Sequence, residues 1–196
     1  MAETIFVCAH GAGGHSNDAG MMRLARVLGA CGLEIVRFNF LYRERGVRVP
    51  DPMPKLMARM QEVAERVRAE RKPERLLLGG RSMGGRTATM LAAEGYACDG
   101  LLLAAYPLHP PGNLAKLRAA HLAKIRCPVM CLNGTRDAFC DRALMDEAVA
   151  QAGAGWTMRW LEGADHSFHV LKSSGRTDAE VDAEVGEAAR EWLKKL

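Results

Sequence analysis

Short apolar runs alternate with longer amphipathic stretches along the whole chain. Each apolar run is bounded by glycine, proline or polar residues, which is typical of a buried strand. We predict six strands, at residues 4–9, 34–40, 75–78, 100–106, 128–132 and 157–161.

The amphipathic stretches carry apolar residues at helical spacing, and we predict a helix in each. The buried stripes are Met21, Leu24, Ala25 and Leu28, then Leu56, Met60, Val63 and Val67, and finally Val181, Val185, Ala188 and Trp192. Further helices are expected at 87–94, after a cap at Asp141, and, as a short helix, around 114–120. Residues 177–180 form a capping box that starts the last helix.

Strands that alternate with helices at this spacing predict a parallel sheet covered on both faces, a three-layer α/β/α fold. No repeat, low-complexity stretch or linker divides the 196 residues, so we expect one domain over residues 1–196. Ligands bind such sheets beyond the carboxyl ends of the strands. Residues 10–14, Ser82, Asp137 and His166 each follow a predicted strand, and we expect them to meet at that edge.

Composition narrows the class of protein. A hydrophobic content of 48%, a charged content of 26% and a net charge of +4 are typical of a globular protein and suggest no nucleic-acid partner. The six cysteines form no C-x-x-C pattern and favour free, buried thiols in a reducing compartment. The first apolar run is too short for a signal core or membrane span, so we expect a cytoplasmic protein with no membrane partner.

We expect neither a metal ion nor a cofactor. No histidine or cysteine cluster has the spacing of a metal site. The glycines at 11, 13 and 14 resemble part of a dinucleotide fingerprint, but Ser16 stands where its third glycine belongs.

Ser82 is the candidate nucleophile. Residues 80–84 read G-R-S-M-G and lie between a predicted strand and a predicted helix, the context in which a G-x-S-x-G motif exposes its serine. The sharp turn requires small residues two positions before and after the serine. The alternative is a glycine-rich turn in which the serine has no chemical role.

A serine hydroxyl needs a base, and the base needs a carboxylate to hold its tautomer. Of six histidines, His166 follows the last strand and precedes the last helix, within reach of Ser82. Asp137, after the fifth strand, is the candidate acid, and Asp165 is a weaker one because loop neighbours usually point apart. The alternatives are a surface histidine and a turn or capping carboxylate.

Acyl transfer also needs donors for an oxyanion. The amide of Met83, directly after the serine, is one candidate. The amide of Ala12, in the glycine-rich loop after the first strand, is the other. His10 is expected to orient that loop rather than to act as a second base.

These motifs resemble the α/β-hydrolase superfamily, and more narrowly its small dienelactone-hydrolase-like group. The loop at 10–14, the serine motif at 80–84, Gly134-x-x-Asp137 and Asp165-His166 occur in the family's order of oxyanion loop, nucleophile, acid and base. The resemblance spans essentially the whole chain. It implies Ser82, Asp137 and His166 as the catalytic triad and the Ala12 and Met83 amides as the oxyanion hole.

The chain departs from the family pattern in three ways. The fuller fold opens with two extra strands, so we expect a minimal six-stranded sheet in the order 2-1-3-4-5-6. The usual cap is reduced to the connection at 107–125, which implies an open, shallow site. Dienelactone hydrolases use cysteine where this chain has Ser82, so that specific activity is not carried over.

The sequence therefore predicts a serine hydrolase that cleaves a small ester, thioester or similar acyl bond through an acyl-enzyme. A non-catalytic binding or scaffold protein of the same fold is the alternative, and a peptidase is a weaker one. Arg43, Arg45 and Arg48, with Arg81, could favour an anionic substrate, but solvated charge is the commoner explanation for such a run. The sequence leaves the oligomeric state open.

Overall fold

The computed structural model describes residues 4–153 and 155–196, which form a sheet of six parallel strands. The strands are β1 (Thr4–Ala9), β2 (Glu34–Phe38), β3 (Arg75–Arg81), β4 (Gly100–Ala104), β5 (Val129–Gly134) and β6 (Trp156–Leu161). Their order is β2-β1-β3-β4-β5-β6, which confirms the predicted topology. The sites expected after β1, β3, β5 and β6 therefore share one edge of the sheet.

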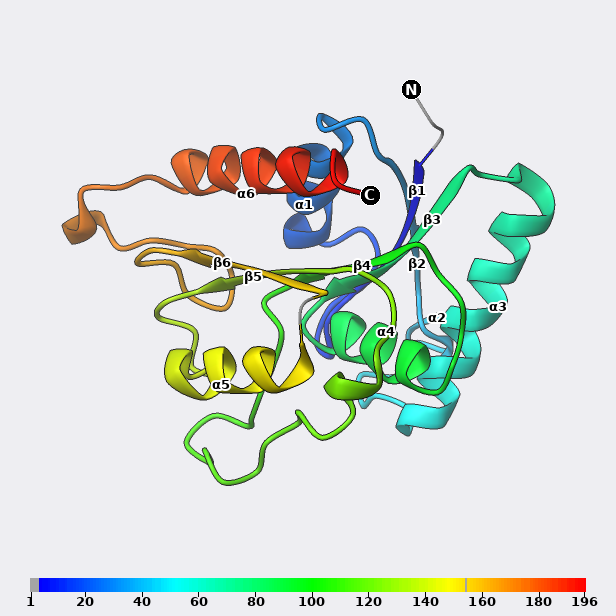
Figure 1. Ribbon diagram of the computed structural model, residues 1–196, viewed down its shortest axis with the longest axis horizontal. Helices are drawn as coiled ribbons and strands as arrows, with labels where there is room; N and C mark the ends of the chain where they lie inside the picture. Colours follow the sequence, from blue (N-terminus) through cyan, green and yellow to red (C-terminus); the bar gives the residue numbers. More distant parts are fainter. Residues whose placement is uncertain (1–3, 154) are drawn as a thin grey trace.

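Helices cover both faces of the sheet (Figure 1). They are α1 (Ala19–Gly29), α2 (Leu41–Glu44), α3 (Met53–Arg71), α4 (Met83–Ala93), α5 (Arg142–Ala152) and α6 (Asp178–Leu193), with 3-10 turns η1 (Leu122–Lys124) and η2 (Lys172–Ser174). Helices α1 and α6 lie on one face, and α3, α4 and α5 lie on the other (Figure 1). The three-layer architecture predicted from the alternation is confirmed.

The central strands are buried on both faces because each face packs against helices. Alternate side chains of β1 enter different cores. Phe6 packs with Met21 and Trp192 under α1 and α6. Val7 packs with Met60 and other residues under α3 and α4.

Side-chain caps fix where three helices start. The Asp18 carboxylate accepts from the amide of Met21, and Asp141 accepts from Leu144. Thr177 and Glu180 form the predicted capping box of α6. Each such cap stabilises its helix by about 1 kcal/mol.

Two helix predictions need correction. Residues 114–120 form turns, because Leu114 and Leu117 are 51% and 44% exposed and a short helix without packing is marginal in water. The only helical turn of that connection, within the described residues, is η1, where Leu122 is buried. The one-turn helix α2 was not predicted; it forms around Tyr42, whose side chain is fully buried.

Strand and helix ends also differ from the prediction. Strand β2 ends at Phe38 and β4 at Ala104, two residues before the predicted ends, because the chain leaves the sheet toward the carboxyl edge. Strand β3 continues to Arg81, and α4 begins at Met83 rather than at residue 87. Ser82 is thus the only residue between them.

No helix within residues 4–153 and 155–196 combines the length and the apolar character needed to cross a membrane.

Candidate active site

Ser82 occupies a strained turn between β3 and α4. Its φ of 51° and ψ of −114° lie outside the regions that ordinary residues favour. A Cβ atom at Gly80 or at Gly84 would overlap the Ala9 backbone on β1. The prediction that these positions need small residues is confirmed, and the structure narrows the choice to glycine. The surrounding structure holds a backbone strain of about 1–3 kcal/mol at Ser82.

His166 links Ser82 to Asp137. The hydroxyl oxygen of Ser82 lies 2.9 Å from Nε2 of His166. Nδ1 of His166 lies 2.9 Å and 2.8 Å from the two carboxylate oxygens of Asp137. The geometry is consistent with a neutral imidazole that donates from Nδ1 to Asp137 and accepts the Ser82 proton at Nε2. The structure brings together all three side chains that the sequence singled out.

The Asp137 carboxylate is buried but well partnered. Its side chain is 0% exposed, whereas that of His166 is 24% exposed. The carboxylate accepts from the Phe139 amide at 2.8 Å and from the Asn133 side-chain amide at 3.3 Å. These donors keep the carboxylate facing His166 and offset the cost of burying its charge.

Asn133 is a site residue that the sequence did not reveal. Its side chain is fully buried at the end of β5. Besides reaching Asp137, it accepts from the Tyr106 amide at 3.0 Å and donates to the Tyr106 carbonyl at 3.1 Å. Asn133 thus connects the carboxyl ends of β4 and β5 to the Asp137 carboxylate. The one sequence feature that could have pointed to Asn133 is its position, as a polar residue directly after a buried apolar run.

A tight loop carries His166 between β6 and α6. The Asp165 carboxylate accepts from the amides of Ser167 and His169, so it shapes the loop, and the carboxylate in contact with the imidazole is that of Asp137. The Phe139 ring lies against the imidazole, with centroids 4.4 Å apart. A side chain at Gly134 would overlap the Ala164 backbone, so this glycine lets the loops of Asp137 and His166 approach.

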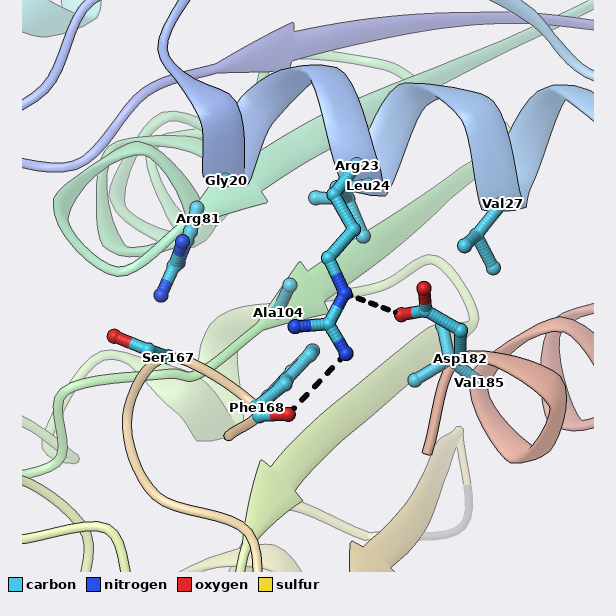
Figure 2. A pocket seen from close by; sticks show the side chains of 10 residues that line it. All are labelled: Gly20, Arg23, Leu24, Val27, Arg81, Ala104, Ser167, Phe168, Asp182 and Val185. Atoms are coloured by element: carbon cyan, nitrogen blue, oxygen red, sulfur yellow. Dashed lines mark hydrogen bonds and ion pairs between the residues drawn. The ribbon is translucent and has the colours of Figure 1, made fainter. Parts of the chain in front are cut away.

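Two arginines hold the same loop from the α1 side. Arg81 donates to the His166 carbonyl at 2.8 Å, and Arg23 donates to the Phe168 carbonyl at 3.3 Å. Figure 2 shows both guanidinium groups in a pocket between α1, α6 and the loop, with Arg23 also bound to Asp182. Burial lowers the pKa of Arg81, although this group stays charged at neutral pH. Neither Ser82 nor His166 lines this pocket.

The loop after β1 lies beside the serine. A Cβ at Gly11 would lie 3.4 Å from Cβ of Ser82. Tyr42 on α2 donates to the Ala12 carbonyl at 2.8 Å and so fixes the orientation of that peptide. Met83, the first residue of α4, has a backbone amide at a position where no intrahelical partner exists.

His10 holds this loop through hydrogen bonds and ring packing. It is fully buried, with Nδ1 2.7 Å from the Gly11 carbonyl and Nε2 accepting from the Phe40 amide at 3.3 Å. Its ring packs edge-on against Phe40 and Tyr42. Burial lowers its pKa, which favours the neutral ring. The loop-orienting position predicted for His10 agrees with these contacts.

The arginine-rich segment after β2 makes local contacts. Arg45 pairs with Asp51 at 2.8 Å while remaining 52% exposed, and the Arg43 contact to the Val47 carbonyl also stays within the segment. Arg48 is exposed. Within residues 4–153 and 155–196, no three histidine, cysteine, aspartate or glutamate side chains are grouped as a metal ion requires.

A family model described as the alpha/beta hydrolase domain matches residues 2–194. The chain belongs to this family. The match spans nearly the whole sequence, so Ser82, Asp137 and His166 all lie inside the family domain.

Solved structures similar to this alpha/beta hydrolase domain share its fold. An alpha-beta serine hydrolase homologue from Coxiella burnetii is 20% identical, with a TM-score of 0.75 over 97% of this chain and 85% of that one. An a/b serine hydrolase without lid from Xanthomonas campestris is 23% identical, with a TM-score of 0.73 over 96% and 81%. A dienelactone hydrolase from Anabaena variabilis is 18% identical, with a TM-score of 0.72 over 99% and 86%.

Proposed function

We propose that this alpha/beta hydrolase is a serine hydrolase that cleaves a small ester, thioester or similar acyl bond. The observation that carries the proposal is the continuous contact from the Ser82 hydroxyl through His166 to the buried Asp137 carboxylate. This arrangement, on a strained turn ahead of a helix, supports an activated serine nucleophile.

In the first step the Ser82 oxygen attacks the acyl carbon while His166 takes the hydroxyl proton at Nε2. The imidazolium that forms is stabilised by Asp137 through Nδ1, and Asp137 itself stays ionised. The hydrogen bond from the Arg81 guanidinium to the His166 carbonyl holds the backbone that carries the ring as the charge of the ring changes.

The carbonyl oxygen becomes an oxyanion in this step and needs donors. We assign the amides of Met83 and Ala12 to that task. The positive end of α4 adds a favourable field at the same point. The Tyr42 hydrogen bond to the Ala12 carbonyl supports this assignment, since it orients the peptide whose neighbouring amide would donate.

His166 then returns its proton to the leaving alcohol or thiol, and an acyl-enzyme on Ser82 remains. A water molecule then attacks the acyl carbon, the bond to the Ser82 oxygen breaks, and the carboxylic acid is released. His166 accepts a proton from the water and afterwards donates it to Ser82.

An open site favours small substrates. The connection from β4 to β5 has only η1 as a helical turn among its residues, and part of it is exposed. The similar Xanthomonas campestris structure is described as being without a lid. We therefore propose a small-molecule acyl substrate. The six free cysteines suit a reducing compartment, and the proposal includes a cytoplasmic location.

The test is hydrolysis of a short p-nitrophenyl ester by wild type and by Ser82→Ala. We expect kcat/KM to fall by about 10⁴-fold or more, because the nucleophile is lost while the fold is kept. Ser173→Ala, an exposed position in η2, is the matched control and should retain wild-type activity.

Equal activity in wild type and Ser82→Ala would contradict the proposal. No turnover of several short esters and thioesters by folded wild type would favour the alternative, a binding or scaffold protein that keeps the triad without using it.

A further inference from the structure

A pair of thiols lies at the opposite edge of the sheet from Ser82. Cys98 lies two residues before β4, and Cys127 lies two residues before β5, the parallel neighbour of β4. The two Sγ atoms are 3.6 Å apart, and both residues are free and half-buried. The thiols are thus within reach of each other without any rearrangement of the sheet.

The backbone on both sides of this pair is anchored. Arg68 donates to the Ala97 carbonyl, directly before Cys98. Asp99, directly after it, exchanges hydrogen bonds with Leu76 through its backbone amide and its carboxylate. The Pro128 carbonyl, next to Cys127, accepts a hydrogen bond from β4. These hydrogen bonds fix the backbone that carries both sulfurs.

Small molecules can reach the pair. Both cysteines line a surface groove together with Tyr96, Lys124, Arg126 and Pro128. The two cationic side chains favour a reagent that carries carboxylates.

The other four cysteines differ from this pair. Burial raises the pKa of Cys8, Cys131 and Cys140 and makes these thiols inert. Burial also raises the pKa of Cys31, whose thiol bonds to backbone carbonyls. By contrast, the hydrogen bond between the two thiols lowers the pKa of Cys127 and raises that of Cys98, which favours the thiolate on Cys127.

We propose that Cys98 and Cys127 form a thiol–disulfide exchange site for a carboxylate-bearing disulfide of low molecular weight. The Cys127 thiolate attacks one sulfur of the small disulfide, whose S–S bond breaks, and the departing thiolate takes up the proton that Cys127 lost. Cys98, as its thiolate, then attacks the Cys127 sulfur and releases the second small thiolate, which takes up the Cys98 proton. Two protein thiols are oxidised to a disulfide, and the small disulfide is reduced to two thiols.

The new bond has a defined structural consequence. It joins Cys98, two residues before β4, to Cys127, two residues before β5, and closes a covalent ring that contains β4 and the connection at 107–125. That connection contacts the Asp137 loop, because the His109 amide donates to the Phe139 carbonyl. The proposed disulfide thus connects the oxidation state of Cys98 and Cys127 to a segment beside the candidate active site.

The test treats reduced, folded wild type with glutathione disulfide, blocks the remaining thiols with an alkylating agent, and maps peptides by mass spectrometry. We expect a Cys98–Cys127 cross-linked peptide that a thiol reductant reverses. Cys98→Ser should instead accumulate glutathione on Cys127, because the resolving thiol is gone. Cys31→Ser, also a half-buried position, should behave as wild type.

Absence of the cross-linked peptide from wild type, or modification of Cys31 in preference to Cys127, would overturn the proposal. The wild-type map decides this even if Cys98→Ser fails to fold. The readout does not depend on hydrolase activity.

Discussion

At the residue scale, the candidate site depends on how the imidazole of His166 is held. Its two ring nitrogens contact the Ser82 hydroxyl and the Asp137 carboxylate, and its ring packs against Phe139. Its backbone carbonyl accepts a hydrogen bond from Arg81. If the imidazole shifts by about 1 Å, Nε2 no longer lies where it can take the serine proton efficiently. We therefore regard Arg81 as a positioning residue that acts through the backbone of His166.

Replacing Arg81 by methionine tests this role. The variant loses a charged hydrogen bond to a partly buried carbonyl, and we expect kcat to fall by about tenfold with little change in KM. Steady-state kinetics on a short ester, well below the melting temperature of each variant, provide the measurement. Arg26→Met, which removes an ion pair between the exposed Arg26 side chain on α1 and Asp182 on α6, should leave kcat unchanged. A rise in KM alone, or equal losses in both variants, would count against the positioning role.

At the element scale, the serine turn works because β1, β3 and α4 approach more closely than side chains allow. Gly84 on α4 and Gly80 on β3 both face the Ala9 backbone, and neither has room for a Cβ atom. The sequence rule for small residues around the serine thus describes a contact between three elements.

Gly84→Ala should be strongly destabilising. Its Cβ would overlap main-chain atoms of Ala9, which cannot rotate away, so we expect a loss of about 3 kcal/mol or more in the free energy of unfolding. That corresponds to a fall in Tm of about 6–12 °C for a chain of this size, measured by thermal unfolding. Gly29→Ala, in α1 with open space around it, should be neutral or up to about 1 kcal/mol more stable. Similar melting temperatures for the two variants would refute the argument.

Much of this element-scale picture could be predicted from the sequence. Apolar runs and capping residues gave all six strands and five of the helices, because burial on both faces and side-chain caps leave strong local patterns. The helix expected at 114–120 was wrong, since its two leucines, Leu114 and Leu117, remain exposed and do not pack against the core. Helix α2 depends on the burial of Tyr42, a tertiary contact with no local pattern.

The candidate site was only partly predictable, for a related reason. Ser82, Asp137 and His166 stand in motifs whose position after a strand is local information. The contacts of Asn133, Arg81 and Phe139 join residues on different elements and emerge only once the chain is folded.

At the scale of the whole molecule, the half-buried His121 links stability to pH. His121, at the start of η1, lies 2.9 Å from the Thr89 hydroxyl on α4. Burial, together with the charges of Arg86 and Lys124, lowers its pKa from 6.5 to about 4. The folded chain thus keeps His121 neutral over an interval in which the unfolded chain binds a proton at that site.

Unfolding should become easier as pH falls from about 6.5 to about 4, and this contribution should level off below that interval. Denaturant unfolding at about pH 7 and about pH 5 measures the change in free energy. In His121→Gln, which removes the titrating group, that change should be smaller by about 1 kcal/mol. An identical pH dependence in both proteins would show that His121 carries no such linkage.

The most direct test of the proposed hydrolase mechanism is labelling by a fluorophosphonate, which reacts with activated serines. Wild type should become labelled, peptide mapping should find the label on Ser82 alone, and Ser82→Ala should remain unlabelled. Labelling at another serine, or a folded wild type that does not react at all, would contradict the central claim that His166 and Asp137 activate Ser82.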